Sequence, residues 1–298
     1  MKAAVIQLNS GADVRANLEQ AQALLEQAAA AGAVLAALPE NCAFMGAKER
    51  DKLLHAEPDG SGPIQQFFAD IAARLNLWVL AGTLPIAAAD PLPNPSPQGG
   101  GAFSLPPPCG EGVNAAGVSH VYAASCLYDA TGARAARYDK IHLFDVDVPG
   151  ASGERYRESN SITPGPVRAA VADSPCGKIG LSVCYDLRFP ELYRAHAAGG
   201  ATLLSVPAAF TAKTGAAHWH TLLKARAVEN QCYVLAPGQC GTHPGGRSTY
   251  GHSLIVGPWG EVLAEVADDA PGLAMAEIDL DHLQAVRASF PVLNHRRL

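Results

Sequence analysis

The chain alternates between short runs of apolar residues and longer segments in which apolar residues recur at helical spacing. Short apolar runs bounded by turn residues predict buried strands, whereas helical spacing predicts amphipathic helices. In the first third of the chain, strands are predicted at 3–8, 33–38 and 77–80. Helices are predicted to begin after Asp13, a capping residue, and at Pro63, a residue that suits a first helical turn.

From residue 118 onwards the pattern changes, because several predicted strands are joined by turns rather than by helices. Strands are predicted at 118–128, 134–140, 167–172, 178–183, 201–206, 232–236, 251–257, 261–266 and 273–278, and helices at 189–198 and 215–231. Hairpins mixed with βα units do not suit a purely parallel sheet. They predict an α/β fold with a mixed sheet, or with two packed sheets that helices cover.

The stretch 90–117 differs from the rest of the chain in composition. It is rich in Pro, Gly, Ser and Asn and contains three consecutive glycines and three consecutive prolines. Such a segment cannot build a core, so we expect a long surface loop. The loop does not separate two complete sets of elements. We therefore expect one domain over residues 1–298, interrupted by this insertion.

Composition and charge narrow the class of protein. Of the 298 residues, 17% are charged, against roughly 25% in an average globular protein. The net charge is −6, so no basic excess exists to replace phosphate counterions, and nucleic acid is not expected as a partner. Sparse charge favours a surface that is buried between subunits, and an oligomer is expected.

No pattern indicates export or membrane insertion. The first ten residues lack the charged and apolar regions of a secretory signal, and no run of about eighteen apolar residues predicts a membrane span. The 7 cysteines are odd in number and form no Cys-x-x-Cys pair, which favours free thiols in a reducing compartment. A cytoplasmic protein is therefore expected.

Two charged residues with possible chemical roles stand at or after predicted strands. Glu40 comes directly after the strand that Pro39 ends, and Lys140 is followed by His142 among apolar neighbours. Taken alone, Glu40 is more typical of a solvated turn. Lys140 and His142, taken alone, are more typical of a surface strand with alternating polar residues.

A third reactive group stands between a strand and a helix. The apolar run 178–183 leads directly into Cys184, and a helix is predicted to begin near Pro190. A strand–turn–helix elbow exposes a nucleophile and points backbone N–H groups at it. The alternative is a buried structural cysteine, which is common in proteins. The charged residues that follow Cys184 leave the two interpretations equally supported.

Glutamate, lysine and cysteine together form a chemical unit. A free cysteine has a pKa of about 8.5 and is mostly thiol at neutral pH, so a carboxylate such as Glu40 could accept its proton. An ammonium group such as Lys140 could stabilise both a thiolate and an oxyanion. The backbone N–H of Tyr185 would complete an oxyanion site. This set predicts acyl transfer through a thioester on Cys184.

These three segments, in this order, resemble the carbon–nitrogen hydrolase (nitrilase) superfamily. The resemblance covers nearly the whole chain apart from the 90–117 loop, and it assigns Glu40, Lys140 and Cys184 as the catalytic set. Lys140 follows Glu40 by 100 positions, and Cys184 follows Lys140 by 44. The 90–117 loop accounts for the long first interval. The resemblance implies a four-layer α-β-β-α sandwich, no metal or organic cofactor, and dimers or larger even-numbered homo-oligomers that pair through helices beside the cysteine elbow.

Further segments narrow the resemblance to the branch that contains omega-amidases and deaminated glutathione amidases. They are 140–145, 147–150, 158–159, 210–211, 214–215, 218–219, 222–227, 239–243 and 250–253. The last two are closer to the deaminated glutathione amidases. This implies hydrolysis of a small carboxylate-bearing amide, deaminated glutathione, to 2-oxoglutarate and cysteinylglycine. Omega-amidase activity on 2-oxoglutaramate, nitrilase activity and N-carbamoyl amide hydrolysis remain alternatives.

The resemblance also implies supporting roles. Glu158, or less well Glu154, matches a second glutamate that positions substrate and lysine. Arg188, Phe210 and Thr214 match residues that line the substrate pocket. From its own position, Arg188 could grip a substrate carboxylate or form a structural ion pair with Asp186 or Glu191. One departure is His220, where many relatives have glutamate.

Two functions of other classes remain. A metal-dependent hydrolase could use imidazoles from His218, His220, His243 and His252. However, residues two apart on a helix point away from each other, so His218 and His220 make a poor ligand pair. A binding protein on an enzyme fold is the second alternative, and the filled catalytic positions argue against it.

Overall fold

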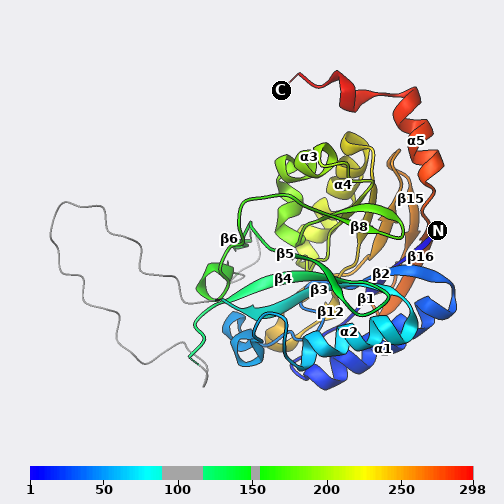
Figure 1. Cartoon of the computed structure of the whole chain (residues 1–298). Coiled ribbons are helices and arrows are strands. Elements are labelled where there is room, and N and C mark those ends of the chain that lie inside the picture. Colours follow the sequence, from blue (N-terminus) through cyan, green and yellow to red (C-terminus); the bar gives the residue numbers. More distant parts are fainter. Residues whose placement is uncertain (89–116, 149–154, 298) are drawn as a thin grey trace, which may run out of the picture.

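The computed structural model describes residues 1–88, 117–148 and 155–297. The predicted loop at 90–117 lies outside these residues except for Gly117, and Glu154 lies outside them too. Two six-stranded mixed sheets pack face to face, and helices cover both outer faces (Figure 1). This is the α-β-β-α sandwich that the family resemblance implies, and the prediction of an α/β fold is confirmed.

The first sheet has the order β16-β1-β2-β3-β4-β5. Its strands are β16 (Gly272–Glu277), β1 (Lys2–Gln7), β2 (Ala33–Ala37), β3 (Trp78–Ala87), β4 (Val121–Tyr128) and β5 (Arg134–Asp139). Strands β1, β2 and β3 are parallel, and the other neighbours pair antiparallel. Helices α1 (Val14–Ala30) and α2 (Pro63–Leu75) connect the parallel strands and cover the outer face.

The second sheet repeats this plan with the order β15-β14-β11-β10-β9-β8. Its strands are β15 (Val262–Glu265), β14 (Leu254–Val256), β11 (Tyr233–Ala236), β10 (Leu203–Ser205), β9 (Gly177–Leu181) and β8 (Ala170–Ser174). Strands β9, β10 and β11 are parallel, and α3 (Pro190–Ala198) and α4 (Ala212–Asn230) connect them. Parallel strands need such crossover connections.

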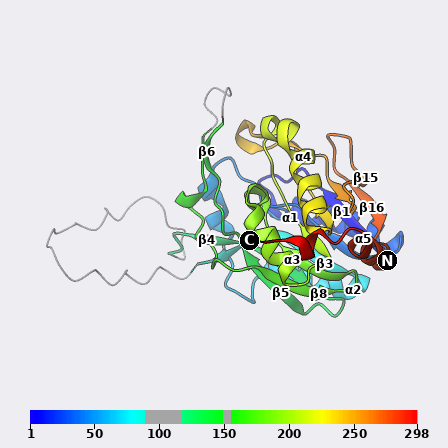
Figure 2. The ribbon, with the colours of Figure 1, turned by 90° about the horizontal axis from the view of Figure 1, so that it is seen from above.

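Smaller elements complete the fold. They are the hairpins β6 (Asp145–Asp147) with β7 (Arg155–Arg157) and β12 (Cys240–Thr242) with β13 (Ser248–Tyr250), helix α5 (Leu280–Ser289), and the 3₁₀ helices η1 (Glu49–His55), η2 (Glu158–Asn160), η3 (Cys184–Arg188), η4 (Pro244–Gly246) and η5 (Val292–His295). Seen from above, the C-terminal segment runs across α3 (Figure 2). No helix among the described residues is long and apolar enough to span a membrane.

The alternation of side chains in β1 explains the four layers. Ala3 and Val5 belong to the core that lies against the second sheet, whereas Ala4 and Ile6 belong to the core beneath α1 and α2. Successive strand residues point to opposite faces, so a strand covered on both sides is apolar at every position. This is why residues 3–6 are apolar at every position.

Most predicted elements are present, with shifted ends. The strand predicted at 77–80 continues to Ala87, and the helix predicted from 215 begins at Ala212. The strand predicted at 251–257 covers only 254–256, because His252 has a positive φ of 53° that a strand cannot accommodate. The six cysteines among the described residues are free and buried, as the odd count predicts.

Candidate active site

The turn after β9 holds Cys184 in an unusual backbone conformation. Its φ is +46°, a value that few residues other than glycine adopt. The Cys184 N–H donates to Pro207 O at 2.9 Å, which fastens the turn to the segment after β10. The chain then enters η3 and, at Pro190, α3. The predicted strand–turn–helix elbow is therefore present, and its strain lies at the cysteine itself.

Asp186 fixes this elbow from beneath. Its fully buried carboxylate accepts hydrogen bonds from the Val183 N–H at 2.8 Å and the Tyr138 hydroxyl at 2.7 Å. The His142 ring nitrogen Nδ1 lies 2.7 Å away. Tyr138 belongs to β5 of the first sheet, and His142 follows it. One carboxylate therefore joins the cysteine turn of the second sheet to the lysine segment of the first.

Glu40 lies in the turn that follows β2. The Cβ of any larger residue at Gly82 would lie 1.8 Å from Pro39 O, so the close approach of β3 to this turn requires glycine. The Glu40 side chain is buried, with Oε1 2.8 Å from Lys140 Nζ. The Ala209 N–H donates to Oε2 at 3.0 Å. Glu40 is thus a fixed, buried carboxylate, and not the solvated turn residue that it resembles when its sequence position is taken alone.

Lys140 lies between two carboxylates. Its side chain is fully buried, and Nζ lies 2.8 Å from Glu40 Oε1 and 2.8 Å from Glu158 Oε2. The Phe144 N–H donates to the same Glu158 oxygen at 2.8 Å. Burial lowers the pKa of Lys140, but the charges of Glu158 and Glu40 outweigh this and raise it well above its ordinary value. Lys140 therefore remains an ammonium group.

The same charges set the protonation of Glu40 and Cys184. Burial raises the pKa of Glu40, but the charge of Lys140 and hydrogen bonds from Lys140 and the Cys184 thiol outweigh it, so the pKa is lowered. Burial and the negative charge of Glu40 raise the pKa of Cys184 well above its ordinary value, against the effect of Lys140. At neutral pH, a carboxylate therefore faces a thiol.

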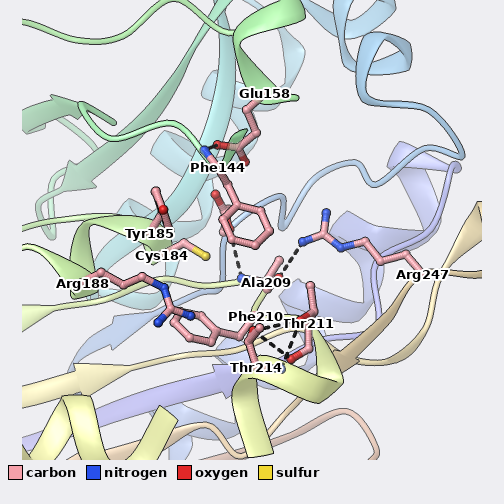
Figure 3. Close-up of a pocket in the computed structure, with 11 residues that line it drawn as sticks. Phe144, Glu158, Cys184, Tyr185, Arg188, Ala209, Phe210, Thr211, Thr214 and Arg247 are labelled. Carbon is pink, nitrogen blue, oxygen red and sulfur yellow. Dashed lines mark hydrogen bonds between the residues drawn. The ribbon is translucent and has the colours of Figure 1, made fainter. Parts of the chain in front are cut away.

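Cys184 opens into a pocket that encloses about 290 Å³ of empty space, the part open to solvent included. Figure 3 shows the side chains that face this space. The lining residues are Glu40, Phe144, Glu158, Cys184, Tyr185, Arg188, Ala209, Phe210, Thr211, Thr214 and Arg247. The structure thus brings Glu40, Glu158, Cys184, Tyr185, Arg188, Phe210 and Thr214 into one pocket, with Lys140 buried behind them.

Arg188 lies against rings rather than carboxylates. Its guanidinium carbon is 5.4 Å from the Phe210 ring centroid and 5.9 Å from that of Tyr185. Nη1 lies 3.3 Å from His218 Nδ1. Asp186, one alternative partner from the sequence, is occupied by the elbow contacts described above. Arg188 therefore presents a cation to the pocket.

Phe210 and Thr214 reach the pocket through the start of α4. Thr211 caps this helix by accepting from the Thr214 N–H at 3.3 Å, and the two threonine hydroxyls lie 2.8 Å apart. Phe210 packs on Trp219 with ring centroids 4.9 Å apart. The cap fixes where α4 begins, and hence where Thr214 faces the pocket.

The family model for carbon-nitrogen hydrolases matches residues 2–288. The chain belongs to this family. It is a hydrolase that acts on carbon–nitrogen bonds other than peptide bonds, and the amidase interpretation of its sequence is confirmed.

Curated and solved relatives agree with this. The chain is 42% identical over 295 residues to a deaminated glutathione amidase of Synechocystis, covering 99% of this chain and 97% of the relative. The fold matches the crystal structure of the C. elegans NitFhit protein with a TM-score of 0.82 and 34% identity, over 99% of this chain and 65% of that one.

A third relative bears on the nucleophile. An amidase from Nesterenkonia sp. AN1, with a TM-score of 0.72 and 27% identity, covers 98% of each chain. Its structure is that of a glutamate-to-glutamine mutant and shows acrylamide added at the active-site cysteine. In that protein, therefore, a cysteine in the same fold reacts with an electrophile.

The sequence did not reveal every residue of the pocket. Arg247 donates from Nη2 to Ala209 O at 2.6 Å and lies over the Tyr156 ring at 5.0 Å. It reaches the pocket from a glycine-rich turn, and no local pattern marks it. Phe144 and Ala209 were also missed as pocket residues, because apolar residues beside catalytic ones carry no signal of their own.

The four candidate metal-ligating histidines do not meet in the pocket. His218 lies beside Arg188, whereas His220 points to Glu265 with Nε2 2.9 Å from Oε1, so the expected divergence of these two is confirmed. His243 is buried between Ser10 O and the Thr249 hydroxyl. His252 also contacts Glu265, with Nδ1 2.7 Å from the same oxygen, Oε1.

Proposed function

We propose that the chain hydrolyses deaminated glutathione to 2-oxoglutarate and cysteinylglycine through a thioester on Cys184. The observation that carries the chemistry is the Glu40 carboxylate, which contacts both the Lys140 ammonium and the Cys184 thiol. The name of the Synechocystis relative, at 42% identity, supports the choice of substrate.

In the first half of the reaction, Glu40 accepts the proton of the Cys184 thiol as Sγ attacks the amide carbonyl carbon. A buried carboxylate in contact with the thiol suits a general base. Negative charge then develops on the carbonyl oxygen, where the Lys140 ammonium and the Tyr185 N–H stabilise it. The carbon–nitrogen bond breaks when Glu40 returns the proton to the leaving amine.

In the second half, water hydrolyses the thioester. Glu40, again a carboxylate, accepts a proton from the attacking water, and Cys184 leaves as the thiol. Glu158 supports both halves by holding the Lys140 ammonium in place and charged. No step calls for a metal or an organic cofactor.

The proposed substrate has a carboxylate at each end. Arg188 would bind the carboxylate of the 2-oxo acid, with Phe210 and Thr214 enclosing the chain between it and Cys184. A second cavity adjoins the pocket at Arg247 and is bordered by Lys48, Lys52 and Arg155, and by Glu49, which pairs with Lys52 at 2.9 Å. The excess of basic residues over this one carboxylate suits the carboxylate of the leaving dipeptide.

We extend the proposal to a cytoplasmic homo-oligomer, a homodimer or a larger even-numbered assembly. The free buried cysteines and the sparse charge support it. Helices α3 and α4 flank the cysteine elbow and are the expected contact surface. Size-exclusion chromatography with light scattering would test the assembly, and a monomer at micromolar concentration would refute it.

The decisive experiment compares kcat/KM for deaminated glutathione and for 2-oxoglutaramate, measured as release of 2-oxoglutarate. The Cys184→Ala variant is the blank, and its circular dichroism checks that the fold is retained. We expect a strong preference for deaminated glutathione and no turnover by the variant. A preference for 2-oxoglutaramate would overturn the substrate. Full activity of Cys184→Ala would overturn the mechanism.

A further inference from the structure

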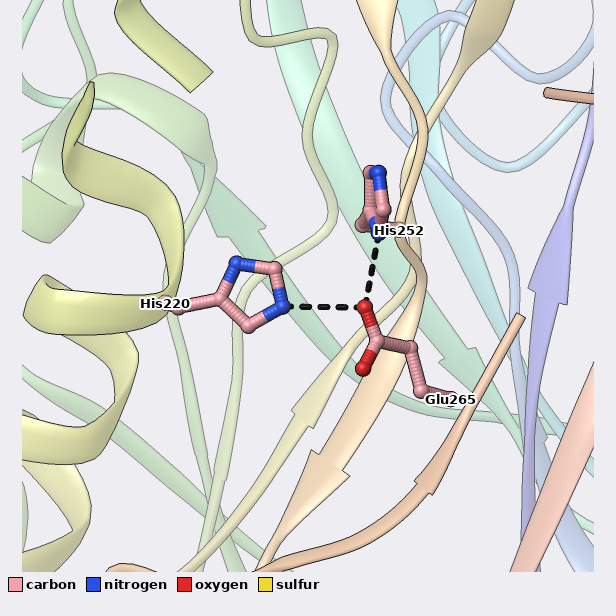
Figure 4. Close-up of side chains that lie close together, drawn as sticks. All are labelled: His220, His252 and Glu265. Atoms are coloured by element: carbon pink, nitrogen blue, oxygen red, sulfur yellow. Dashed lines mark hydrogen bonds and ion pairs between the residues drawn. The ribbon is translucent and has the colours of Figure 1, made fainter. Parts of the chain in front are cut away.

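Three potential metal ligands converge at a point that the proposed reaction does not use. His220 comes from α4, His252 from the turn before β14, and Glu265 from the end of β15 (Figure 4). Glu265 Oε1 lies 2.9 Å from His220 Nε2 and 2.7 Å from His252 Nδ1. None of the three lines the pocket of Cys184. Two imidazole nitrogens thus point at one carboxylate oxygen.

The surrounding structure holds two of these groups in place. His252 has a φ of +53°, and its carbonyl accepts a hydrogen bond from Trp219 Nε1 at 2.9 Å. Its ring stacks on Tyr250 with centroids 4.4 Å apart and an interplanar angle of 26°. Trp219 is the neighbour of His220 on α4, so the same hydrogen bond fixes the helix next to His252. The imidazoles therefore converge because the backbone directs them there.

The chemistry of the three side chains suits a cation. Two imidazole rings and one carboxylate offer three ligand atoms that lie close together. Such a combination of nitrogen and oxygen donors is a ligand set that zinc binds in proteins.

We propose that His220, His252 and Glu265 bind a divalent cation of the Zn²⁺ class at a site separate from the active site. The three ligand atoms lie within 4.8 Å of one another. Tetrahedral zinc, with bonds of about 2.0–2.2 Å, needs its ligand atoms roughly 3.3 Å apart. The carboxylate oxygen would withdraw by about half an ångström from each nitrogen, and the two nitrogens, which lie within 4.8 Å of each other, would move closer together, to admit an ion at those bond lengths.

The exposure of the ligands fits a site that water completes. The side chains of His220, His252 and Glu265 are 32%, 30% and 25% exposed. A bound ion would thus reach solvent, which supplies the fourth ligand. It would also join α4 to β15 through bonds stronger than the present hydrogen bonds. Because an ion that binds only the folded state stabilises it, thermal stability should rise on binding.

The test uses the full chain, freed of any affinity tag and of metal by EDTA, and titrated with Zn²⁺ in equilibrium dialysis. The Cys184→Ser background removes the active-site thiol as a competing ligand. We expect one equivalent to bind, with the Tm raised by several degrees at saturation. Co²⁺ in place of Zn²⁺ should give the visible absorption of a tetrahedral site.

Three variants assign the ligands. Glu265→Gln and His252→Ala should each weaken Zn²⁺ binding at least ~10-fold and abolish the shift in Tm. His218→Ala, two residues from His220 on the same helix but directed at Arg188, should bind as the parent does. Equal binding by Glu265→Gln, His252→Ala and the parent would overturn the proposal. So would no binding by the parent at 100 μM free Zn²⁺, a level at which about one equivalent is expected.

Discussion

Lys140 Nζ lies 2.8 Å from Glu40 Oε1, and both side chains are buried. With Glu158 on the other side of the ammonium, the group carries one positive and two negative charges. A buried ion pair is worth little net stability compared with apolar packing, but removing one partner leaves uncompensated charge. The cluster should therefore dominate both the stability of this region and its chemistry.

The first prediction concerns stability. Lys140→Met leaves two buried carboxylates facing each other, and we expect it to lower the free energy of unfolding by about 3–5 kcal/mol. Adding Glu158→Gln removes one of these charges, so the double variant should be more stable than Lys140→Met alone. Urea unfolding followed by fluorescence would measure both. A double variant less stable than the single one would show that the charges do not interact as described.

The second prediction separates nucleophile from base. In Glu40→Gln, Lys140 still faces the thiol, and the carboxylate that raises the pKa of Cys184 is gone. The thiol should therefore still react with iodoacetamide, at least as fast as in the parent. Amide turnover should fall about 10²–10⁴-fold, because the proton acceptor is lost. Loss of both reactions together would point instead to a collapsed pocket.

The third prediction is a pH profile. The pKa of Glu40 is lowered below 4.5, so its carboxylate, and with it the activity, is lost only as pH falls below that value. The pKa of Cys184 is raised above 9.0, so the thiol persists as pH rises to that value and beyond. We expect kcat/KM to be flat between about pH 5 and 9. An acid limb near pH 6–7 would indicate a histidine-dependent mechanism and contradict the assignment.

Local pattern explains why much of this molecule could be predicted from its sequence. The 3–8 run is a strand and Asp13 caps a helix, because each depends on neighbours within a few residues. Helix α5 was missed although Asp279 caps it by accepting from the N–H groups of Asp281 and His282. A capping residue before an apolar run at helical spacing would have marked it.

The site was predictable only in part, because its geometry depends on distant segments. Glu40, Lys140 and Cys184 each follow or end a predicted strand, and this position marked them as candidate catalytic residues. Arg247 reaches the pocket from a glycine-rich turn that no local pattern connects to Cys184. Glu265 contacts His220, although the two residues are 45 positions apart in the chain. The spacing of residues along the sequence does not predict such a contact.

The fourth prediction concerns the substrate carboxylate. Arg188→Gln removes a charged donor from the pocket, and we expect KM for a 2-oxo acid amide to rise about 10–100-fold. For the methyl ester of the same substrate, which lacks the charge, the change should be small. Arg194→Gln, on α3 and paired with Glu229, is the matched control. An equal rise for acid and ester would assign Arg188 a structural role.

The fifth prediction concerns Asp186, which touches no substrate but positions the cysteine turn. The Val183 N–H and the Tyr138 hydroxyl both donate to Asp186 Oδ2, and the His142 N–H donates to Oδ1 at 3.2 Å. In Asp186→Asn, an NH₂ group, which cannot accept a hydrogen bond, replaces one of these oxygens. At least one donor is left unpaired, at a cost of about 1–3 kcal/mol. Because Cys184 holds a strained φ of +46°, that loss should let the turn relax. We expect kcat to fall more than KM rises, and the alkylation rate of Cys184 to change. Asp173→Asn, at the exposed position of strand β8, should alter none of these. If Asp186→Asn lost stability but kept the kcat and the alkylation rate of the parent, Asp186 would support the fold without positioning the nucleophile.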